Sequence, residues 1–94
     1  MSRKVLSNEQ KILNKFIGER VMEYRLKANV KRFPLARAIG VTPIMIKRYE
    51  EGLFSISVSI LLGICKVLEN CRLSDLIPDE RELERLRLLD PKAD

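Results

Sequence analysis

The 94-residue sequence contains no histidine and no tryptophan, and it has only two cysteines. The absence of histidine removes the most common general base and a frequent metal ligand. Cys65 and Cys71 lie among apolar residues without C-x-x-C spacing, so we interpret them as small buried hydrophobic residues in a reducing compartment. No Ser/Lys pair or pair of carboxylates stands out. We therefore expect no enzyme, no metal site and no cofactor.

Long apolar runs are also absent from the chain. No tract of about 18 uncharged apolar residues occurs, so a membrane span is not expected. Residues 1–11 lack the apolar core of a secretory signal. We therefore expect a cytoplasmic protein, and the length predicts a single domain.

The charge is spread unevenly over 18 Lys or Arg and 13 Asp or Glu. Residues 1–32 hold nine basic against three acidic residues, a net charge of +6, whereas residues 79–94 have a net charge of −2. A basic half favours a polyanionic partner such as nucleic acid, although a solvated basic face would have the same composition.

The apolar spacing is helical throughout, with no sustained alternation and no hairpin signal. A long first helix should begin near Ser7, which can form a capping box with Gln10, and should fade near residues 28–29. Gly18 lies inside this helix and lowers its propensity. The expected buried stripe comprises Ile12 or Leu13, Phe16 or Ile17, Val21 and Tyr24.

A second helix should begin at or just before Pro34. Proline is tolerated in the first turn of a helix, and it disfavours the α conformation at the preceding residue, Phe33. This helix should continue to Ile39 and end at Gly40.

A third helix should follow at once. Thr42 is a favourable N-cap, and Pro43 is favoured at the first helical position. We expect this helix to end near Glu51, where Gly52 supplies a C-cap.

Ser57 should cap a fourth helix with the sequence "VSILLGICKVLEN", which we expect at the centre of the core. Its expected buried residues are Ile60, Leu61, Ile64, Cys65 and Leu68. A short fifth helix should occupy "LSDLI" and stop at Pro78.

The charged tail, residues 79–94, carries a leucine stripe that includes Leu83 and Leu86. This stripe favours one more short helix, ended by Pro91. The stripe has two interpretations, a helix that packs on the domain or a seam between two copies of the chain.

The strongest pattern links three positions, Ala36, Gly40 and Ile46. Two helices that cross steeply need a small residue at their closest approach, which Ala36 provides. The tight turn needs a residue that tolerates positive φ, which Gly40 provides. Ile46 then fills the angle between the helices, with Val41 and Tyr49 closing the interior. This is the spacing of a helix-turn-helix.

The segments "IGERVMEYR", "PLARAIGVT" and "IKRYEEG" also follow a known pattern. They resemble the first helix, the "eLAxxlGvs" motif and the "ixxyExG" motif of the XRE family, the Cro/cI-type helix-turn-helix regulators. A bacterial branch that reads "VTxqQIQKYExGxNRISxSRL" is nearer still. The resemblance covers about residues 17–77. It implies an all-α, five-helix lambda-repressor-like domain, usually a homodimer, that binds operator DNA.

The expected organisation is therefore a DNA-binding domain at residues 1–78, with the helix-turn-helix at residues 32–52 and an extended first helix, followed by the tail. The resemblance implies a bacterial transcriptional regulator, such as a repressor, that associates with the nucleoid in the cytoplasm. Its expected partner is double-stranded DNA.

In that family the helix after the turn lies in the major groove. On a helix that begins at Pro43, positions 43 and 47 share a face, as do positions 44 and 48. The resemblance thus implies that Pro43, Ile44, Lys47 and Arg48 face the bases, with Thr42 at the rim. Lys47 or Arg48 would donate to guanine, and Ile44 would contact a thymine methyl group.

The expected contacts to the DNA backbone come from Lys31, Arg32, Ser55 and Ser57. Arg32 takes the place of a glutamine that grips a phosphate in the family, and a guanidinium can do the same. The two serines stand where the next loop and helix N-terminus usually meet the backbone.

Two polar clusters of the family pattern are apolar here. Ile44 and Met45 stand where glutamines are usual, and Leu53 and Phe54 stand where Asn and Arg are usual. Ile44 either reads thymine methyls or joins Leu53 and Phe54 in an exposed patch that binds another protein. Met45 is expected to pack beneath the second helix. Leu53 and Phe54 are expected in the core or in a subunit contact.

The alternative function is a protein-interaction or antitoxin-like module on the same fold, with weak or no specific DNA binding, since fold does not determine function. Its candidate protein interface comprises Leu53, Phe54, Leu83 and Leu86.

Overall fold

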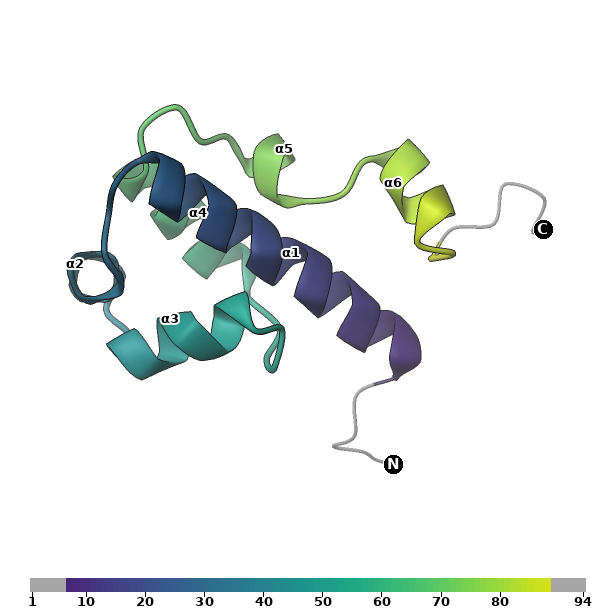
Figure 1. Cartoon of the computed structure of the whole chain (residues 1–94), viewed down its shortest axis with the longest axis horizontal. Coiled ribbons are helices and arrows are strands. Elements are labelled where there is room, and N and C mark those ends of the chain that lie inside the picture. The colour runs from purple at the N-terminus through teal and green to yellow at the C-terminus, as the bar shows by residue number, and fades with distance from the viewer. Residues whose placement is uncertain (1–6, 89–94) are drawn as a thin grey trace.

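The computed structural model of the protein describes residues 7–88, and every regular element among them is a helix (Figure 1). The helices are α1 (Asn8–Lys27), α2 (Arg32–Ile39), α3 (Pro43–Glu50), α4 (Val58–Val67), α5 (Leu73–Leu76) and α6 (Glu80–Arg85). The expected all-α class is confirmed, with an extended first helix and a short helix in the tail. None of the helices in this range is long and apolar enough to cross a membrane.

α1 crosses the front of the molecule in Figure 1, with α3 below it and α5 and α6 above it. α1 packs against α3 and α5, α2 packs against α3 and α4, and α4 packs against α5. The core between them consists of Val21, Leu35, Ala36, Ile46, Tyr49, Leu61, Ile64, Leu68, Cys71 and Leu76. Of the residues expected in the core from the fourth helix, Leu61, Ile64 and Leu68 are buried, whereas Ile60 and Cys65 are half-buried.

The ends of α1 follow local signals in the sequence. The Ser7 hydroxyl accepts a hydrogen bond from the Gln10 backbone N–H at 3.1 Å, and the Gln10 side chain accepts one from the Ser7 N–H at 2.8 Å. This confirms the expected capping box. At the other end Asn29 has a φ of 59°, and the Val30 N–H donates to the Arg25 carbonyl at 3.1 Å. These two features terminate the helix.

α2 begins earlier than predicted. Arg32 is its first residue, Phe33 is helical, and Pro34 occupies the third position. The first four N–H groups of a helix have no partner within it, so proline removes no hydrogen bond at this position. The preference of the residue before proline for an extended conformation therefore did not determine the boundary.

The predicted apolar stripe of α1 is confirmed in part, because Val21 is buried and Ile17 and Tyr24 pack against the core, but the most buried positions also include polar residues. The buried residues of α1 are Asn14, Gly18, Val21 and Arg25, spaced by four, three and four positions. Ile12 is 40 % exposed. The side chain at position 14 and that at position 25 are polar, and each has a partner from a distant element.

The tail helix α6 is shorter than predicted, because it ends at Arg85. Arg87 then adopts a φ of 63°, which is not helical. The expected stop at Pro91 lies outside the described residues.

Candidate nucleic-acid interface

The turn between α2 and α3 has the geometry that the sequence predicted. Gly40 has a φ of 78°, and the Val41 N–H donates to the Ala36 carbonyl at 3.0 Å. The Thr42 hydroxyl accepts from the Met45 N–H at 3.3 Å, which caps α3. Pro43 occupies the first turn of α3, as expected. The angle between the two helices is therefore determined by local backbone bonds.

The buried side of α3 anchors this helix to the rest of the domain. Ala36 and Ile46 have no exposed surface, and Tyr49 is 8 % exposed. Met45 is partly buried against the same core, which agrees with the prediction that it packs inward. The opposite side of α3 is therefore free to meet a ligand.

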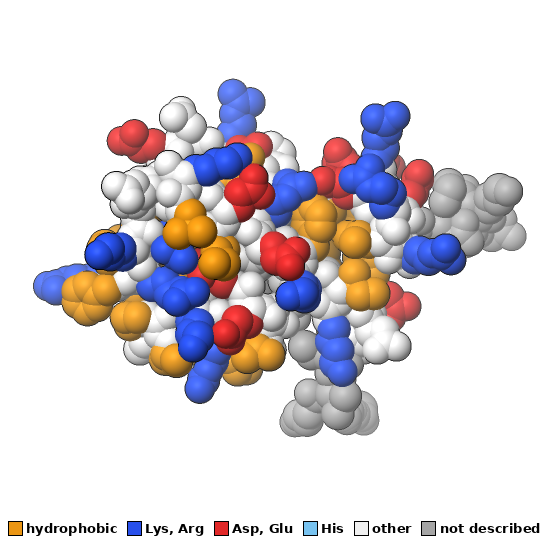
Figure 2. All heavy atoms as spheres, in the orientation of Figure 1, with side chains coloured by type: hydrophobic (Ala, Val, Ile, Leu, Met, Phe, Trp, Pro, Cys, Tyr) orange, Lys and Arg blue, Asp and Glu red, His pale blue; other side chains and the backbone are white. Residues whose placement is uncertain are grey.

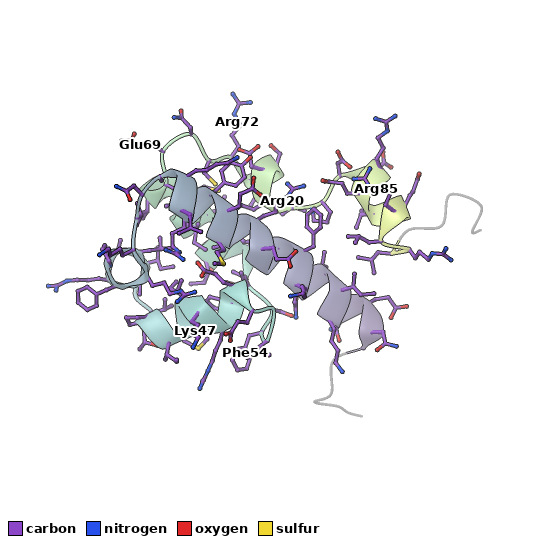
Figure 3. All side chains as sticks on the ribbon, viewed as in Figure 1. Arg20, Lys47, Phe54, Glu69, Arg72 and Arg85 are labelled. Carbon is purple, nitrogen blue, oxygen red and sulfur yellow. The ribbon has the colours of Figure 1, made fainter. Side chains whose placement is uncertain are left out.

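The five residues predicted to face bases are all exposed. Thr42, Pro43 and Ile44 form the first turn of this surface, and Lys47 and Arg48 form the next. Figure 2 shows basic side chains gathered over α2 and α3 together with several apolar ones, and Figure 3 shows Lys47 on α3. α3 thus presents a mixed cationic and apolar face.

A buried ionic network holds α3 against α1 and α2. The Glu50 carboxylate accepts hydrogen bonds from Arg25 Nε at 2.6 Å, Arg25 Nη2 at 3.2 Å and Arg32 Nε at 3.0 Å. Arg25 Nη1 donates to the Val30 carbonyl at 2.9 Å. The side chains of Glu50 and Arg25 are 1 % and 6 % exposed, and that of Arg32 is 36 % exposed. Glu50 is therefore a structural ion-pair partner of both arginines.

Arg32, which was predicted to contact the DNA backbone, also has a structural role in this network. Its Nε atom is engaged by Glu50, while about a third of the side chain faces solvent at the first residue of α2. The guanidinium is therefore held in place by an internal partner rather than extended freely. Lys31, the N-cap residue of α2, is exposed beside it. Together they place two cations at one end of α2.

The two serines predicted to meet the DNA backbone each have an internal role. The Ser55 hydroxyl donates to Asn14 Oδ1 at 3.1 Å, which ties the loop after α3 to α1. The Ser57 hydroxyl accepts from the Ile60 N–H at 3.2 Å and caps α4. Both residues are exposed.

Sequence reasoning missed the roles of Asn14 and Arg25. The available signal was their spacing from Gly18 and Val21, since all four residues lie on one face of α1. A polar residue at such a position indicates a buried partner.

The candidate protein interface is not one surface. Leu53 is 55 % exposed and Phe54 is 44 % exposed, which excludes the core interpretation for both residues. Ile44 is 49 % exposed and lies in the first turn of α3, whereas Leu53 and Phe54 follow its last turn. Figure 3 shows Phe54 at the turn that follows α3.

Leu83 and Leu86 belong to a different region, because α6 packs on α1. Both leucines are half-buried, and Leu86 lines an apolar groove with Ile12 and Phe16. Arg20 of α1 pairs with Glu82, and its Nη1 atom donates to the Asp75 carbonyl at 2.7 Å. These contacts favour the packing interpretation of the leucine stripe over a seam between copies.

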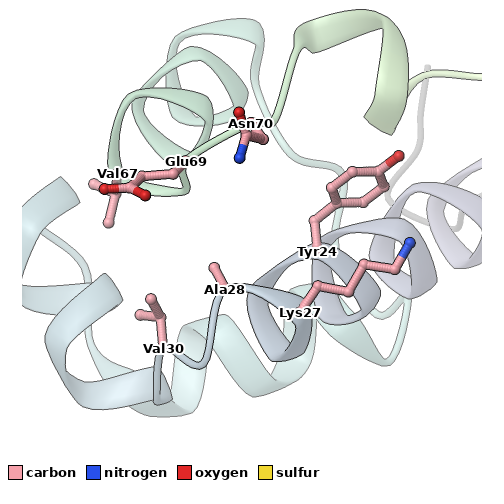
Figure 4. A pocket seen from close by; sticks show the side chains of 7 residues that line it. All are labelled: Tyr24, Lys27, Ala28, Val30, Val67, Glu69 and Asn70. Atoms are coloured by element: carbon pink, nitrogen blue, oxygen red, sulfur yellow. The ribbon is translucent and has the colours of Figure 1, made fainter.

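A pocket of about 550 Å³ lies between the end of α1 and the end of α4 (Figure 4). It is lined by Tyr24, Lys27, Ala28, Val30, Val67, Glu69 and Asn70. Lys27 pairs with Glu23 at 3.0 Å, and this carboxylate raises the pKa of Lys27. The lining contains one cationic side chain, one anionic side chain and otherwise neutral residues. The pocket therefore does not favour a polyanion.

The two cysteines lie close together near the end of α4. Their sulfur atoms are 3.9 Å apart, and Cys71 is 9 % exposed. Burial, followed by the neighbouring Cys65, raises the pKa of the Cys71 thiol to about 12. Within residues 7–88 no cluster of three or more His, Cys, Asp or Glu side chains is arranged to hold a metal ion.

A helix-turn-helix family model matches residues 21–76, more than half of the chain. The matched segment begins in the second half of α1 and ends with the last residue of α5, so it includes α2, α3 and their turn. No curated protein and no solved structure matches the chain.

Proposed function

The chain belongs to the XRE-type helix-turn-helix family of DNA-binding transcriptional regulators, and we propose that it binds double-stranded DNA as a homodimer through the exposed face of α3. The observation that carries this proposal is the division of α3 into two sides. Ile46 and Tyr49 are buried, while Ile44, Lys47 and Arg48 are exposed on a helix whose angle is held by the turn at Gly40.

In this proposal Lys47 and Arg48 donate to base edges in the major groove, and Arg48 can engage guanine O6 and N7 with two donors. Ile44 contacts a thymine methyl group, while Thr42 and Pro43 lie at the edge of the groove. Few of these side chains form directional hydrogen bonds with bases. We therefore expect modest sequence discrimination.

Most of the affinity comes from the DNA backbone. Lys31 and Arg32 at the start of α2 bind phosphate, and the exposed Ser55 and Ser57 approach the backbone beside α4. Each neutralised phosphate releases condensed counterions, so affinity should fall steeply as salt concentration rises. Glu50 supports this contact because it holds Arg32 by its Nε atom.

The regulation is steric and needs no catalysis. In a two-fold dimer the two α3 helices would enter successive major grooves about 34 Å apart. Occupation of these grooves blocks or recruits RNA polymerase at the nucleoid of a bacterial cytoplasm, with repression as the simplest outcome.

Selection of bound sequences from a random duplex pool tests the proposal, and a palindromic consensus is the expected result. Fluorescence anisotropy with the consensus and a scrambled duplex, repeated across salt concentrations, then measures discrimination and salt dependence. Salt-insensitive binding, or no binding to any duplex, contradicts the proposal.

Substitutions on α3 assign the roles of individual side chains. Arg48→Ala should cost about 1–3 kcal/mol at the consensus, which is roughly 5- to 150-fold in Kd. Lys31→Ala should weaken binding to all sequences and reduce the salt slope by about one. Arg81→Ala removes an exposed charge from α6 and serves as the control.

A further inference from the structure

The two cysteines of the chain lie on either side of one short loop. Cys65 belongs to the last turn of α4, and Cys71 precedes Arg72, the N-cap residue of α5. Within the loop Asn70 has a φ of 60°, a left-handed conformation that reverses the direction of the chain (Figure 1). The loop therefore brings Cys71 back toward the last turn of α4.

The two sulfur atoms are in contact. They lie 3.9 Å apart, and the Cys71 sulfur also lies 4.0 Å from the Arg72 carbonyl oxygen. A disulfide bond is about 2 Å long, so the two sulfurs need to approach by roughly 2 Å more. Rotation about the two Cα–Cβ bonds, with small shifts in residues 68–72, can supply this displacement. The pair is therefore within reach of a bond once an oxidant acts.

The two thiols differ in their access to solvent. Cys65 is half-buried, whereas Cys71 is 9 % exposed. Burial, followed by the neighbouring Cys65, raises the pKa of the Cys71 thiol to about 12, so this thiol stays protonated at neutral pH. A protonated and buried thiol is a poor first target for an oxidant. A small oxidant dissolved in water should therefore react with Cys65 first.

We propose that Cys65 and Cys71 form a reversible oxidation site, which a hydroperoxide converts into a disulfide within one chain. First, the Cys65 sulfur attacks hydrogen peroxide, the O–O bond breaks, one water leaves, and Cys65 becomes a sulfenic acid. Next, the Cys71 sulfur attacks the Cys65 sulfur, and the S–S bond forms as the S–O bond breaks. The Cys71 proton leaves with the departing hydroxyl group as a second water. The two thiols lose two electrons, and the peroxide gains them.

The fold favours the second step over further oxidation. Conversion of the sulfenic acid to a sulfinic acid needs another molecule of peroxide. Attack by Cys71 needs no further encounter, because its sulfur is already in contact with that of Cys65. A thiol reductant reverses the disulfide by exchange. The expected product is therefore the disulfide, and the site should cycle between two states.

The disulfide would close residues 65–71 into a loop and tie the last turn of α4 to the start of α5. Such a cross-link stabilises a fold mainly by restricting the unfolded chain. Val67, Glu69 and Asn70 lie inside this closed loop and line one side of the pocket in Figure 4. Oxidation should therefore stiffen this side of the pocket. α3 lies outside the closed loop, so the inference does not depend on the proposed function.

Intact-mass spectrometry of the full chain before and after treatment with equimolar hydrogen peroxide tests the site. The expected product has lost two hydrogen atoms, has no free thiol and stays monomeric on a non-reducing gel. Dithiothreitol should restore the original mass. The midpoint of thermal unfolding should rise by at least about 4 °C in the oxidised chain.

Two single variants separate the roles of the cysteines. Cys71→Ser should stop at the sulfenic acid of Cys65, which dimedone traps as a covalent adduct. Cys65→Ser should leave the buried Cys71 unmodified at the same dose of peroxide. Circular dichroism checks that both variants fold, and the result on the wild-type chain stands without them.

Several outcomes would overturn the proposal. A wild-type chain that stays unmodified, gains oxygen without losing hydrogen, or links to a second chain excludes the disulfide within one chain. Modification of Cys71 in the Cys65→Ser variant would reverse the assigned order of reaction. An oxidised chain whose thermal midpoint does not rise would show that the disulfide does not tie α4 to α5.

Discussion

The backbone of α1 at Gly18 touches the backbone of α3 at Tyr49. A Cβ atom on Gly18 would lie 2.2 Å from the Tyr49 carbonyl oxygen and 2.9 Å from the Glu50 carbonyl oxygen. Both of these neighbours are main-chain atoms, which cannot rotate away. α1 and α3 can therefore approach this closely only because position 18 has no side chain.

Gly18→Ala should destabilise the domain by about 1–3 kcal/mol or more, because α1 must move away from α3. This loss exceeds the gain of up to about 1 kcal/mol in helix propensity. Urea denaturation followed by circular dichroism measures the change. Gly63→Ala in α4 is the control, since its Cβ would meet only the Ile39 side chain at 3.2 Å. Equal stability of the two variants would contradict the close approach at Gly18.

Glu50→Ala should cost about 3–5 kcal/mol in the free energy of unfolding. The substitution leaves the Arg25 guanidinium buried, with its side chain 6 % exposed and its charge unpaired. Glu51→Ala removes the neighbouring exposed carboxylate and should change stability by less than about 0.5 kcal/mol. The double variant Arg25→Met with Glu50→Leu should recover most of the loss. If the double variant is no more stable than Glu50→Ala, the unpaired charge is not the cause.

The Cys71 thiol should make stability depend on pH in the alkaline range. Burial beside Cys65 raises its pKa from an ordinary value of 9.0 to about 12 in the folded state. Between these values the unfolded chain loses the proton and the folded chain keeps it, so stability falls as pH rises through this window. Cys71→Ala should show a smaller fall in unfolding free energy between pH 8 and pH 10.5 than the wild-type chain. Parallel curves for the two proteins would argue against a raised pKa.

Arg20→Ala should release α6 from α1 without unfolding the domain. Arg20 pairs with Glu82 and donates to the Asp75 carbonyl, and it also lies 4.5 Å from the centre of the Phe16 ring. Amide hydrogen exchange in α6 should accelerate, while exchange in α4 stays slow. Arg81→Ala, which removes an exposed charge from α6 itself, should leave the exchange pattern unchanged. Protection of α6 that survives Arg20→Ala would assign the docking to its leucines alone.

Features that depend on near neighbours were predictable from the sequence. The capping box of Ser7 and Gln10, the left-handed turn at Gly40 and the start of α3 at Thr42 each involve residues within a few positions of one another. Hydrogen bonds of this kind form at the ends of helices between residues close in sequence. The residue types at those positions therefore predict them. The exposed and buried sides of α3 followed from helical periodicity for the same reason.

Predictions that ignored distant contacts were less accurate. From the sequence, Gly18 was predicted only to lower the propensity of its helix. The Tyr49 carbonyl that requires a glycine there belongs to another helix. The predicted apolar stripe of α1 omitted Asn14 and Arg25, which are buried beside it because their partners Ser55 and Glu50 lie far along the chain. The early start of α2 placed Arg32 within reach of Glu50, which no local rule anticipates.

The sequence by itself determined the helical class, most helix boundaries, the helix-turn-helix and the residues on the outer side of α3, because these depend on spacing and capping within one or two turns. The tertiary structure alone decided which polar groups are buried and paired, how closely α1 approaches α3, and that Leu86 covers α1 while Leu53 and Phe54 stay exposed. These outcomes depend on which distant residues meet. A buried charge is tolerated only where the opposing surface supplies a partner for it, and a glycine is needed only where another backbone approaches closely.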